Sequence, residues 1–122
     1  MTDRRENTCK YALYSRTLGH IFDESADGTR AQVKVGHRFA ISLGENPTTG
    51  YTWHLVTDGA GVCTLIGDRF RVRGFLLGRS GVHQWLFLAA QLGTCSIMLE
   101  KRRSSKSSVA QRFHVEIMAV RE

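Results

Sequence analysis

The residues in this chain that could do chemistry are its histidines, its cysteines and a few loop serines. The five histidines and three cysteines form no C-x-x-C or H-x-x-x-H pair. Zinc sites rely on such spacings to bring several ligands together, so no metal site is predicted. His54 and His83 fall at polar positions of strand-like runs, where an exposed histidine is the ordinary outcome.

The segment Gly78-Arg79-Ser80-Gly81 comes nearest to a motif for a catalytic nucleophile. It differs from a G-x-S-x-G elbow because its second glycine comes one position early and no strand-turn-helix context surrounds it. Glycine-rich phosphate-binding motifs are absent, and no pair of carboxylates stands at the candidate loops to act as acid and base. The sequence therefore predicts that the chain is not an enzyme and uses no cofactor.

Length and composition predict one domain with a hydrophobic core of ordinary size. The chain has 122 residues, of which 42% are hydrophobic. A domain of this length buries about two-thirds of its surface, so it needs neither a metal nor disulfides to fold. No stretch approaches about 18 consecutive apolar residues, so no membrane-spanning helix is expected. The polar segment 1–10 is not followed by the apolar run of a secretory signal.

The cysteines favour a reducing compartment. Their number is odd, and Cys9, Cys63 and Cys95 lie far apart, which does not suit a disulfide framework. A cytoplasmic location is favoured over a vesicular or lysosomal one. Cys63 and Cys95 lie in strand-like apolar runs and are interpreted as small hydrophobic residues of the core.

The chain is basic, with 17 Lys and Arg residues against 11 Asp and Glu residues and a net charge of +6. This charge suits a nucleic acid, an anionic surface or an acidic protein, and it does not choose among them. The densest basic segment is a loop predicted from Glu100 to about Ala110. Its cations are Lys101, Arg102, Arg103 and Lys106. The loop has no interleaved aromatic residues to stack on bases, and its serines are interpreted as flexible filler, so nucleic acid is not the favoured partner.

The elements that must position these residues are short strands. Residues 1–17 are polar and are predicted to be a mobile N-terminal extension, and residues 18–122 to be the folded domain. Within the domain, Arg38–Leu43 alternates apolar with polar residues, and Val82–Ala90 reads as a central strand buried on both faces. No segment has the apolar spacing of a helix. The pattern predicts an all-β fold, an antiparallel β-sandwich or barrel of about seven to eight strands.

The segment Asn46-Pro47-Thr48-Thr49-Gly50 carries the only proline of the chain and is followed by Tyr51 and Trp53. Proline fixes its own φ and pushes the preceding residue out of the α region, so the segment is predicted as a turn that cannot join a helix. Gly50 accepts a positive φ, which suits a tight return into the next strand. On this segment alone, a plain hairpin turn is favoured over a binding loop.

Three loops taken together resemble the chagasin family of cysteine-peptidase inhibitors, over about Leu18 to Val120. The first loop, Asn46–Gly50 with Tyr51 and Trp53, matches the family pattern N-P-T-T-G-[FY]-x-W. The second loop, Gly78–Gly81, resembles the family's G-x-G-G, with Ser80 in place of a glycine. The third loop places Arg103-Ser104-Ser105 where the family has R-P-W/F, and keeps only the arginine. Outside the loops, Val35-Gly36 and Arg112-Phe113 also match the family.

The resemblance implies an immunoglobulin-like β-sandwich with the three loops gathered at one end. In such inhibitors the first loop enters the active-site cleft of a papain-like peptidase, and the other two grip the walls of the cleft. Trp53 and Trp85 are expected to be core residues beneath the loops. The residues implied to bind the peptidase are Asn46, Pro47, Thr48, Thr49, Gly50, Gly78, Arg79, Ser80, Gly81, Arg103, Ser104 and Ser105.

The function implied is that of a monomeric, reversible, tight-binding inhibitor of papain-like cysteine peptidases of the papain or cathepsin L type. It would act by occluding the active site. The alternative is an immunoglobulin-like binding module without inhibitory activity, which contacts nucleic acid or an acidic protein through its basic third loop.

Overall fold

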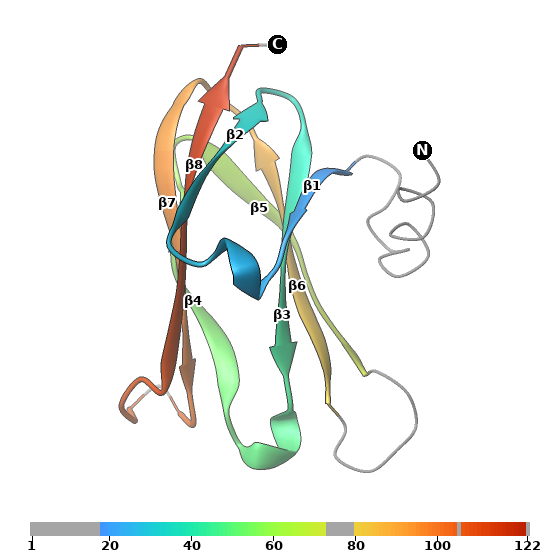
Figure 1. Ribbon diagram of the computed structural model, residues 1–122, viewed down its shortest axis with the longest axis vertical. Helices are drawn as coiled ribbons and strands as arrows, with labels where there is room; N and C mark the ends of the chain where they lie inside the picture. The colour runs from blue at the N-terminus through green and yellow to red at the C-terminus, as the bar shows by residue number, and fades with distance from the viewer. Residues whose placement is uncertain (1–17, 73–79, 105, 122) are drawn as a thin grey trace.

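Two four-stranded β-sheets pack face to face in the computed structural model, which describes residues 18–72, 80–104 and 106–121 (Figure 1). One sheet has the order β1 (Leu18–Phe22), β3 (Arg38–Glu45), β6 (Gly81–Ala89), β5 (Cys63–Val72). The other has the order β2 (Thr29–Lys34), β8 (Gln111–Val120), β7 (Gly93–Arg102), β4 (Thr52–Asp58). Two short 3₁₀ helices, η1 (Glu24–Ala26) and η2 (Pro47–Thr49), lie between strands. The predicted β-sandwich is confirmed.

Most neighbouring strands in the two sheets are antiparallel, but β1 pairs with β3 and β2 pairs with β8 in parallel. The chain passes from β1 in one sheet to β2 in the other and back to β3. A strand that returns from the opposite sheet is not held to its neighbour by a hairpin, so it is free to run parallel to it.

The core lies between the sheets and is built from alternating residues of the inner strands. Phe39 of β3 stacks on Phe87 of β6, with ring centroids 5.2 Å apart. Trp53 and Trp85 are buried, as predicted. On the outer face of the same sheet Ala40 and Leu86 form a second buried cluster, so β6 is buried on both faces, as predicted.

Strand β7 is longer than predicted and includes Glu100, Lys101 and Arg102, which the sequence placed in the third loop. Its pairing with β4 continues to Thr52 opposite Arg102, and its pairing with β8 continues to Gln111 opposite Lys101. Backbone hydrogen bonds on both sides therefore keep a polar segment in the strand. The loop proper comprises residues 103–110.

The strand registers bring three connections to one end of the sandwich, which we call the loop end. Glu45, just before the first loop, lies opposite Gly81, and Gly81 also lies opposite Val72. The β3–β4, β5–β6 and β7–β8 connections therefore leave the sheets together, at the bottom of Figure 1. The prediction for residues 1–17 falls outside the described residues.

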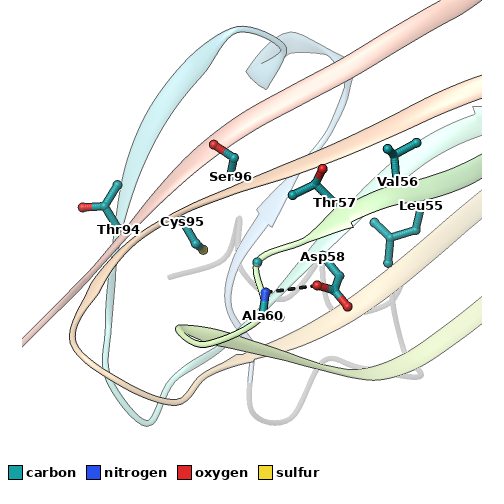
Figure 2. A pocket seen from close by; sticks show the side chains of 9 residues that line it. Leu55, Val56, Thr57, Asp58, Ala60, Thr94, Cys95 and Ser96 are labelled. Carbon is teal, nitrogen blue, oxygen red and sulfur yellow. Dashed lines mark hydrogen bonds between the residues drawn. The ribbon is translucent and has the colours of Figure 1, made fainter.

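An open cleft of about 490 Å³ lies toward the opposite end, between the end of β4 and the start of β7 (Figure 2). Residues 55–60 and 94–96 line it. Because Thr52, and not Asp58, is the end of β4 next to the first loop, this cleft does not belong to the loop end. In the part of the chain that the structure describes, no helix is both long and apolar enough to cross a membrane.

Candidate functional site

The first loop, Asn46–Gly50, is an exposed turn that is held by its own hydrogen bonds. The side-chain oxygen of Asn46 accepts from the backbone N–H of Thr48 at 3.1 Å and from the Thr48 hydroxyl at 2.6 Å. The carbonyl oxygen of Asn46 accepts from the backbone N–H and the hydroxyl of Thr49 at 3.1 and 2.7 Å. Pro47, Thr48, Thr49 and Gly50 are all exposed, so the structured tip faces outward.

Pro47 and Gly50 play the conformational parts that the sequence predicted, with one correction. Asn46 is extended at φ −125° and ψ 96°, and Gly50 is left-handed at φ 85°. Pro47–Thr49, however, forms one 3₁₀ turn, although we predicted that the segment could not join a helix. Proline is tolerated in the first turn of a helix, because the N–H it lacks would have no partner there.

A buried carboxylate fastens the base of the first loop. Glu45 comes directly before the loop in β3, and its side chain accepts from the backbone N–H of Trp53 in β4 at 3.0 Å. The indole N–H of Trp53 donates to the carbonyl oxygen of Gly44 at 2.9 Å. Because β3 and β4 belong to different sheets, these two bonds join the sheets directly beneath the loop.

His83 connects Glu45 to β5 and β6, the two strands that the second loop joins. One ring nitrogen, Nδ1, lies 3.0 Å from Glu45, and the other, Nε2, contacts Asp68 in β5. The ring stacks on Trp85 with centroids 4.0 Å apart, and the side chain is only 16% exposed. The prediction that His83 is exposed is therefore wrong. Residues 81, 83, 85 and 87 share the inner face of β6, so His83 follows the alternation of Trp85 and Phe87.

The third loop is a compact turn at its tip. The hydroxyl of Ser107 accepts from the backbone N–H groups of Arg103 and Ser104 at 3.1 and 3.0 Å, and it donates to the carbonyl oxygen of Ser104 at 2.9 Å. The interpretation of these serines as flexible filler is wrong for Ser104 and Ser107. Serine hydroxyls commonly replace backbone partners in turns of this kind.

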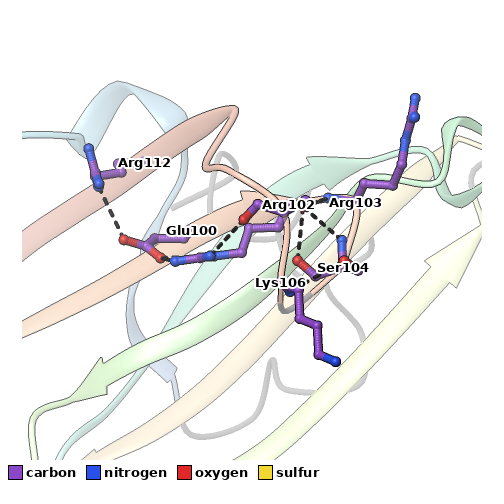
Figure 3. Close-up of polar contacts among 7 residues, drawn as sticks. Glu100, Arg102, Arg103, Ser104, Lys106 and Arg112 are labelled. Atoms are coloured by element: carbon purple, nitrogen blue, oxygen red, sulfur yellow. Dashed lines mark hydrogen bonds and ion pairs between the residues drawn. The ribbon is translucent and has the colours of Figure 1, made fainter.

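Glu100 anchors the stem of the third loop between two arginines (Figure 3). Arg102 donates to one carboxylate oxygen and Arg112 to the other, the second contact at 3.1 Å. Arg102 also donates to the carbonyl oxygen of Ser107 at 2.9 Å. The hydrogen bonds and charges of Arg102 and Arg112 hold the pKa of Glu100 below its ordinary value, and Arg102 has the larger effect.

Arg103 links the third loop to the first. Its guanidinium lies over the ring of Tyr51, 5.0 Å from the centroid. Its aliphatic chain also passes close to Gly50, where an added Cβ would lie 3.7 Å from the Cγ of Arg103. In the same way, Lys101 lies over Trp53 at 5.4 Å. The Arg103–Tyr51 contact holds the third loop against the first, whereas Lys101 and Trp53 are neighbours on the paired strands β7 and β4.

The second loop is described only at its end. Ser80 is exposed, and Gly81 is buried as the first residue of β6. A Cβ at Gly81 would collide with the carbonyl oxygen of Arg71, so the close β5–β6 pairing itself requires this glycine. The predicted contacts of Gly78, Arg79 and Ser105 fall outside the described residues. Among the described residues, no group of three His, Cys, Asp or Glu side chains is placed to hold a metal.

The structure thus brings the first loop, Ser80 and Arg103 to one end of the molecule. Sequence reasoning missed Glu45 and His83, which fasten the base of that end. One signal was available for Glu45, since a carboxylate stood directly before the proline turn. For His83, the alternation with Trp85 and Phe87 was a local signal for the inner face, but its polar partners could not be foreseen, because they lie 15 and 38 positions away.

The family model for the Chagasin family peptidase inhibitor I42 matches residues 32–117, most of the chain. The chain belongs to the chagasin family of cysteine peptidase inhibitors. The resemblance stated on the three loops is confirmed, and this is a family of inhibitors, not of enzymes. A comparison with curated proteins finds no match.

Solved structures share the chagasin fold with this chain. The cysteine protease inhibitor EhICP2 from Entamoeba histolytica has a TM-score of 0.74 at 19% identity, over 83% of this chain and 95% of that chain. Amebosin has a TM-score of 0.61 at 22% identity, over 83% and 97%. PbICP-C, solved in complex with falcipain-2, has a TM-score of 0.59 at 15% identity, over 84% and 100%.

Proposed function

We propose that this chagasin-family chain inhibits papain-like cysteine peptidases of the papain or cathepsin L type, tightly and reversibly, by placing its first loop in the active-site cleft. The observation that carries the proposal is the first loop itself. It is an exposed turn that stands at the loop end, is ordered by its own hydrogen bonds and is fastened at its base by Glu45. Ser80 of the second loop and Arg103 of the third loop lie at the same end, and we propose that these two loops contact the walls of the cleft.

Order in the free loop favours tight binding. A loop that is already held in one conformation loses little conformational entropy when it docks, and preorganisation raises affinity mainly by lowering this cost. In the first loop, the proline and the hydrogen bonds to Asn46 supply that order. The turn is also uncharged, so its insertion into a cleft leaves no unpaired charge behind.

The conformation of the first loop explains how it would resist cleavage. The carbonyl oxygen of Asn46 already accepts from Thr49, and that of Pro47 accepts from the N–H of Gly50 at 2.9 Å. A peptide bond is cleaved efficiently only when its carbonyl carbon is presented to the nucleophile in attack geometry. In the 3₁₀ turn, these carbonyl groups point toward N–H donors of the loop itself. The turn therefore does not present them to a nucleophile in attack geometry.

The third loop supplies positive charge at the edge of the surface. Arg103 and Lys106 are exposed and point away from Glu100 (Figure 3). The loop lacks the proline and aromatic residue of the family pattern. We infer that electrostatic attraction to an acidic rim of the peptidase replaces the missing aromatic contact. Rim charges act mainly on the rate of association.

Titration of a peptidase with the purified chain tests the proposal. Papain and a cathepsin L-type peptidase would each be incubated with increasing amounts of the chain, and residual hydrolysis of a small peptide substrate would be measured. We expect stoichiometric loss of activity that returns on dilution, with the chain recovered uncleaved. Full peptidase activity at micromolar concentrations of the chain would overturn the proposal.

A further inference from the structure

We propose that Cys63 and Cys95 form a reversible disulfide that joins the two sheets of the sandwich. Both thiols are free in the structure, and their sulfur atoms lie 3.4 Å apart although the residues are 32 positions apart in sequence. Cys63 begins β5 in one sheet, and Cys95 lies in β7 of the other. The bond would therefore be an inter-sheet link, which the sequence did not predict.

The geometry brings the two sulfur atoms close to bonding distance. A disulfide bond is about 2.05 Å long, so the sulfurs must approach by about 1.4 Å. Rotation about the Cα–Cβ bonds moves each sulfur on a short arc, and both cysteines already point toward each other.

Gly59 makes room for this approach. It follows β4 with φ 75°, and a Cβ there would lie 2.9 Å from the sulfur of Cys95 and 3.4 Å from the Cβ of Cys63. Its carbonyl oxygen accepts from the N–H of Cys63 at 2.8 Å, which holds the turn against the two thiols. The only residue type that fits both the left-handed backbone and the narrow space is glycine.

A small oxidant reaches the pair from one side. Cys95 is partly exposed and lines the open cleft between β4 and β7 (Figure 2). Cys63 is buried. With glutathione disulfide as oxidant, the thiolate of Cys95 attacks one sulfur and releases one glutathione thiolate. The thiolate of Cys63 then attacks the sulfur of Cys95 and releases the second. The two protein thiols are oxidised, the glutathione disulfide is reduced to two thiols, and these take up the two protons.

The environment of the thiols makes this reaction slow near neutral pH. Burial, together with the neighbouring thiol of Cys95, raises the pKa of Cys63 to about 12. Burial also raises the pKa of Cys95, although its hydrogen bond with Cys63 acts in the opposite direction, and the charges of Asp58 and Glu116 add to the rise. Because the thiolate is the attacking species, bond formation is expected to accelerate as pH rises.

The cysteine pair lies away from the loop end. Cys63 is opposite Ala89 at the far end of β6, whereas the second loop joins β6 at Gly81. A bond there would restrict the unfolded chain and hold the sheets together without altering the first or third loop. Only the expected effect of the disulfide on inhibition rests on the proposed function.

The experiment uses the full chain with Cys9→Ser, which removes the third cysteine. The protein is incubated with glutathione disulfide at about pH 8.5, where thiolates are more abundant. We expect a mass loss of about 2 Da, a peptide map that links Cys63 to Cys95, and a melting temperature raised by about 10 °C or more. Dithiothreitol should reverse all three. Only mixed disulfides with glutathione, only linked dimers, or an unchanged melting temperature would overturn the proposal.

Two further variants serve as matched controls. Cys63→Ser and Cys95→Ser in the same background should show no mass loss of this kind and no rise in melting temperature on oxidation. If either variant folds poorly, the peptide map of the Cys9→Ser chain still decides whether the bond forms.

Inhibition is measured separately with the oxidised and the reduced chain, after the oxidant is removed and against a freshly activated peptidase. The two inhibition constants should agree within about twofold, because the bond is remote from the loops. A large loss of inhibition on oxidation would contradict that remoteness. If neither form inhibits, the proposed function fails, while mass and melting temperature still decide the disulfide.

Discussion

Thr49 combines an exposed position with two hydrogen bonds that shape the first loop. Its hydroxyl donates to the carbonyl oxygen of Asn46 and accepts from the N–H of Tyr51 at 3.3 Å. We expect Thr49→Lys to weaken inhibition by about 100-fold or more, because a long charged side chain would be buried in the cleft without a partner. The measurement is the inhibition constant against papain.

The fold should survive this change, since Thr49 lies outside both sheets and the core. Thr64 provides a matched control, because it is an exposed threonine of β5 near the opposite end of the sandwich. Thr64→Lys adds the same charge and should leave the inhibition constant unchanged. An unaltered inhibition constant for Thr49→Lys would remove the first loop from the centre of the interface.

At the scale of elements, the hydrogen bonds of Trp53 in β4 to Glu45 and Gly44 in β3 hold the loop end together. Glu45→Gln keeps the shape of the side chain but replaces a charged acceptor for Trp53 and His83 with a neutral one. We expect a loss of about 1–3 kcal/mol in the free energy of unfolding, together with weaker inhibition. Urea denaturation and inhibition titrations measure the two effects.

Glu116→Gln is the matched control for Glu45→Gln. Glu116 pairs with Arg30 on an exposed surface, where ion pairs contribute about 1 kcal/mol or less. Its replacement should change stability little and inhibition not at all. Equal effects of the two substitutions would show that Glu45 has no special part in holding the first loop.

The sequence was most informative where local residue types decide the conformation. Proline and glycine at fixed spacing predicted the turn of the first loop, and alternation in β3 predicted a strand at the core. It was least informative where distant residues meet. Glu100 belongs to β7 because it pairs with Arg112 of β8 in the sheet and also forms an ion pair with it. The residue types at positions 100–102 do not by themselves predict a strand.

The same distinction between local residue types and distant contacts explains why the sequence did not predict that Cys63 and Cys95 meet. Their number and spacing argued against a disulfide framework, and their apolar surroundings predicted burial, which is correct for Cys63 and partly correct for Cys95. Their meeting depends on how two sheets stack at one corner of the sandwich. Packing between layers is set by all the strands together, so the spacing of two residues cannot reveal it.

For the whole molecule, Glu100 predicts how stability responds to acid. Its pKa is lower in the folded chain than the ordinary value of 4.5. The resulting stabilisation is fully present above that value and is lost as pH falls through the lower folded pKa. We expect the stability difference between the native chain and Glu100→Gln to shrink below about pH 4.5. Urea midpoints across this range test it, and a difference that does not vary with pH would contradict it.

The net charge of +6 predicts how the whole molecule approaches its target. If an acidic rim attracts the basic third loop, the association rate should fall by about tenfold between low and high salt, while dissociation changes little. Stopped-flow or surface-binding kinetics give both rates. Arg103 and Lys106 are the exposed cations of the third loop, so the double change to alanine should flatten the salt dependence. An association rate of the native chain that is independent of salt would contradict the electrostatic contribution.

The first loop leaves one sheet at Glu45 and enters the other at Thr52, so this turn connects the two layers. Its two supports belong to different halves of the molecule, and neither half could present the turn by itself. Separation of the two sheets would therefore remove both supports of the first loop at once, and we expect no half-folded form to inhibit a peptidase. We therefore expect the temperature at which half of the inhibition is lost on heating to equal the temperature at which half of the molecules have lost the packing between the sheets.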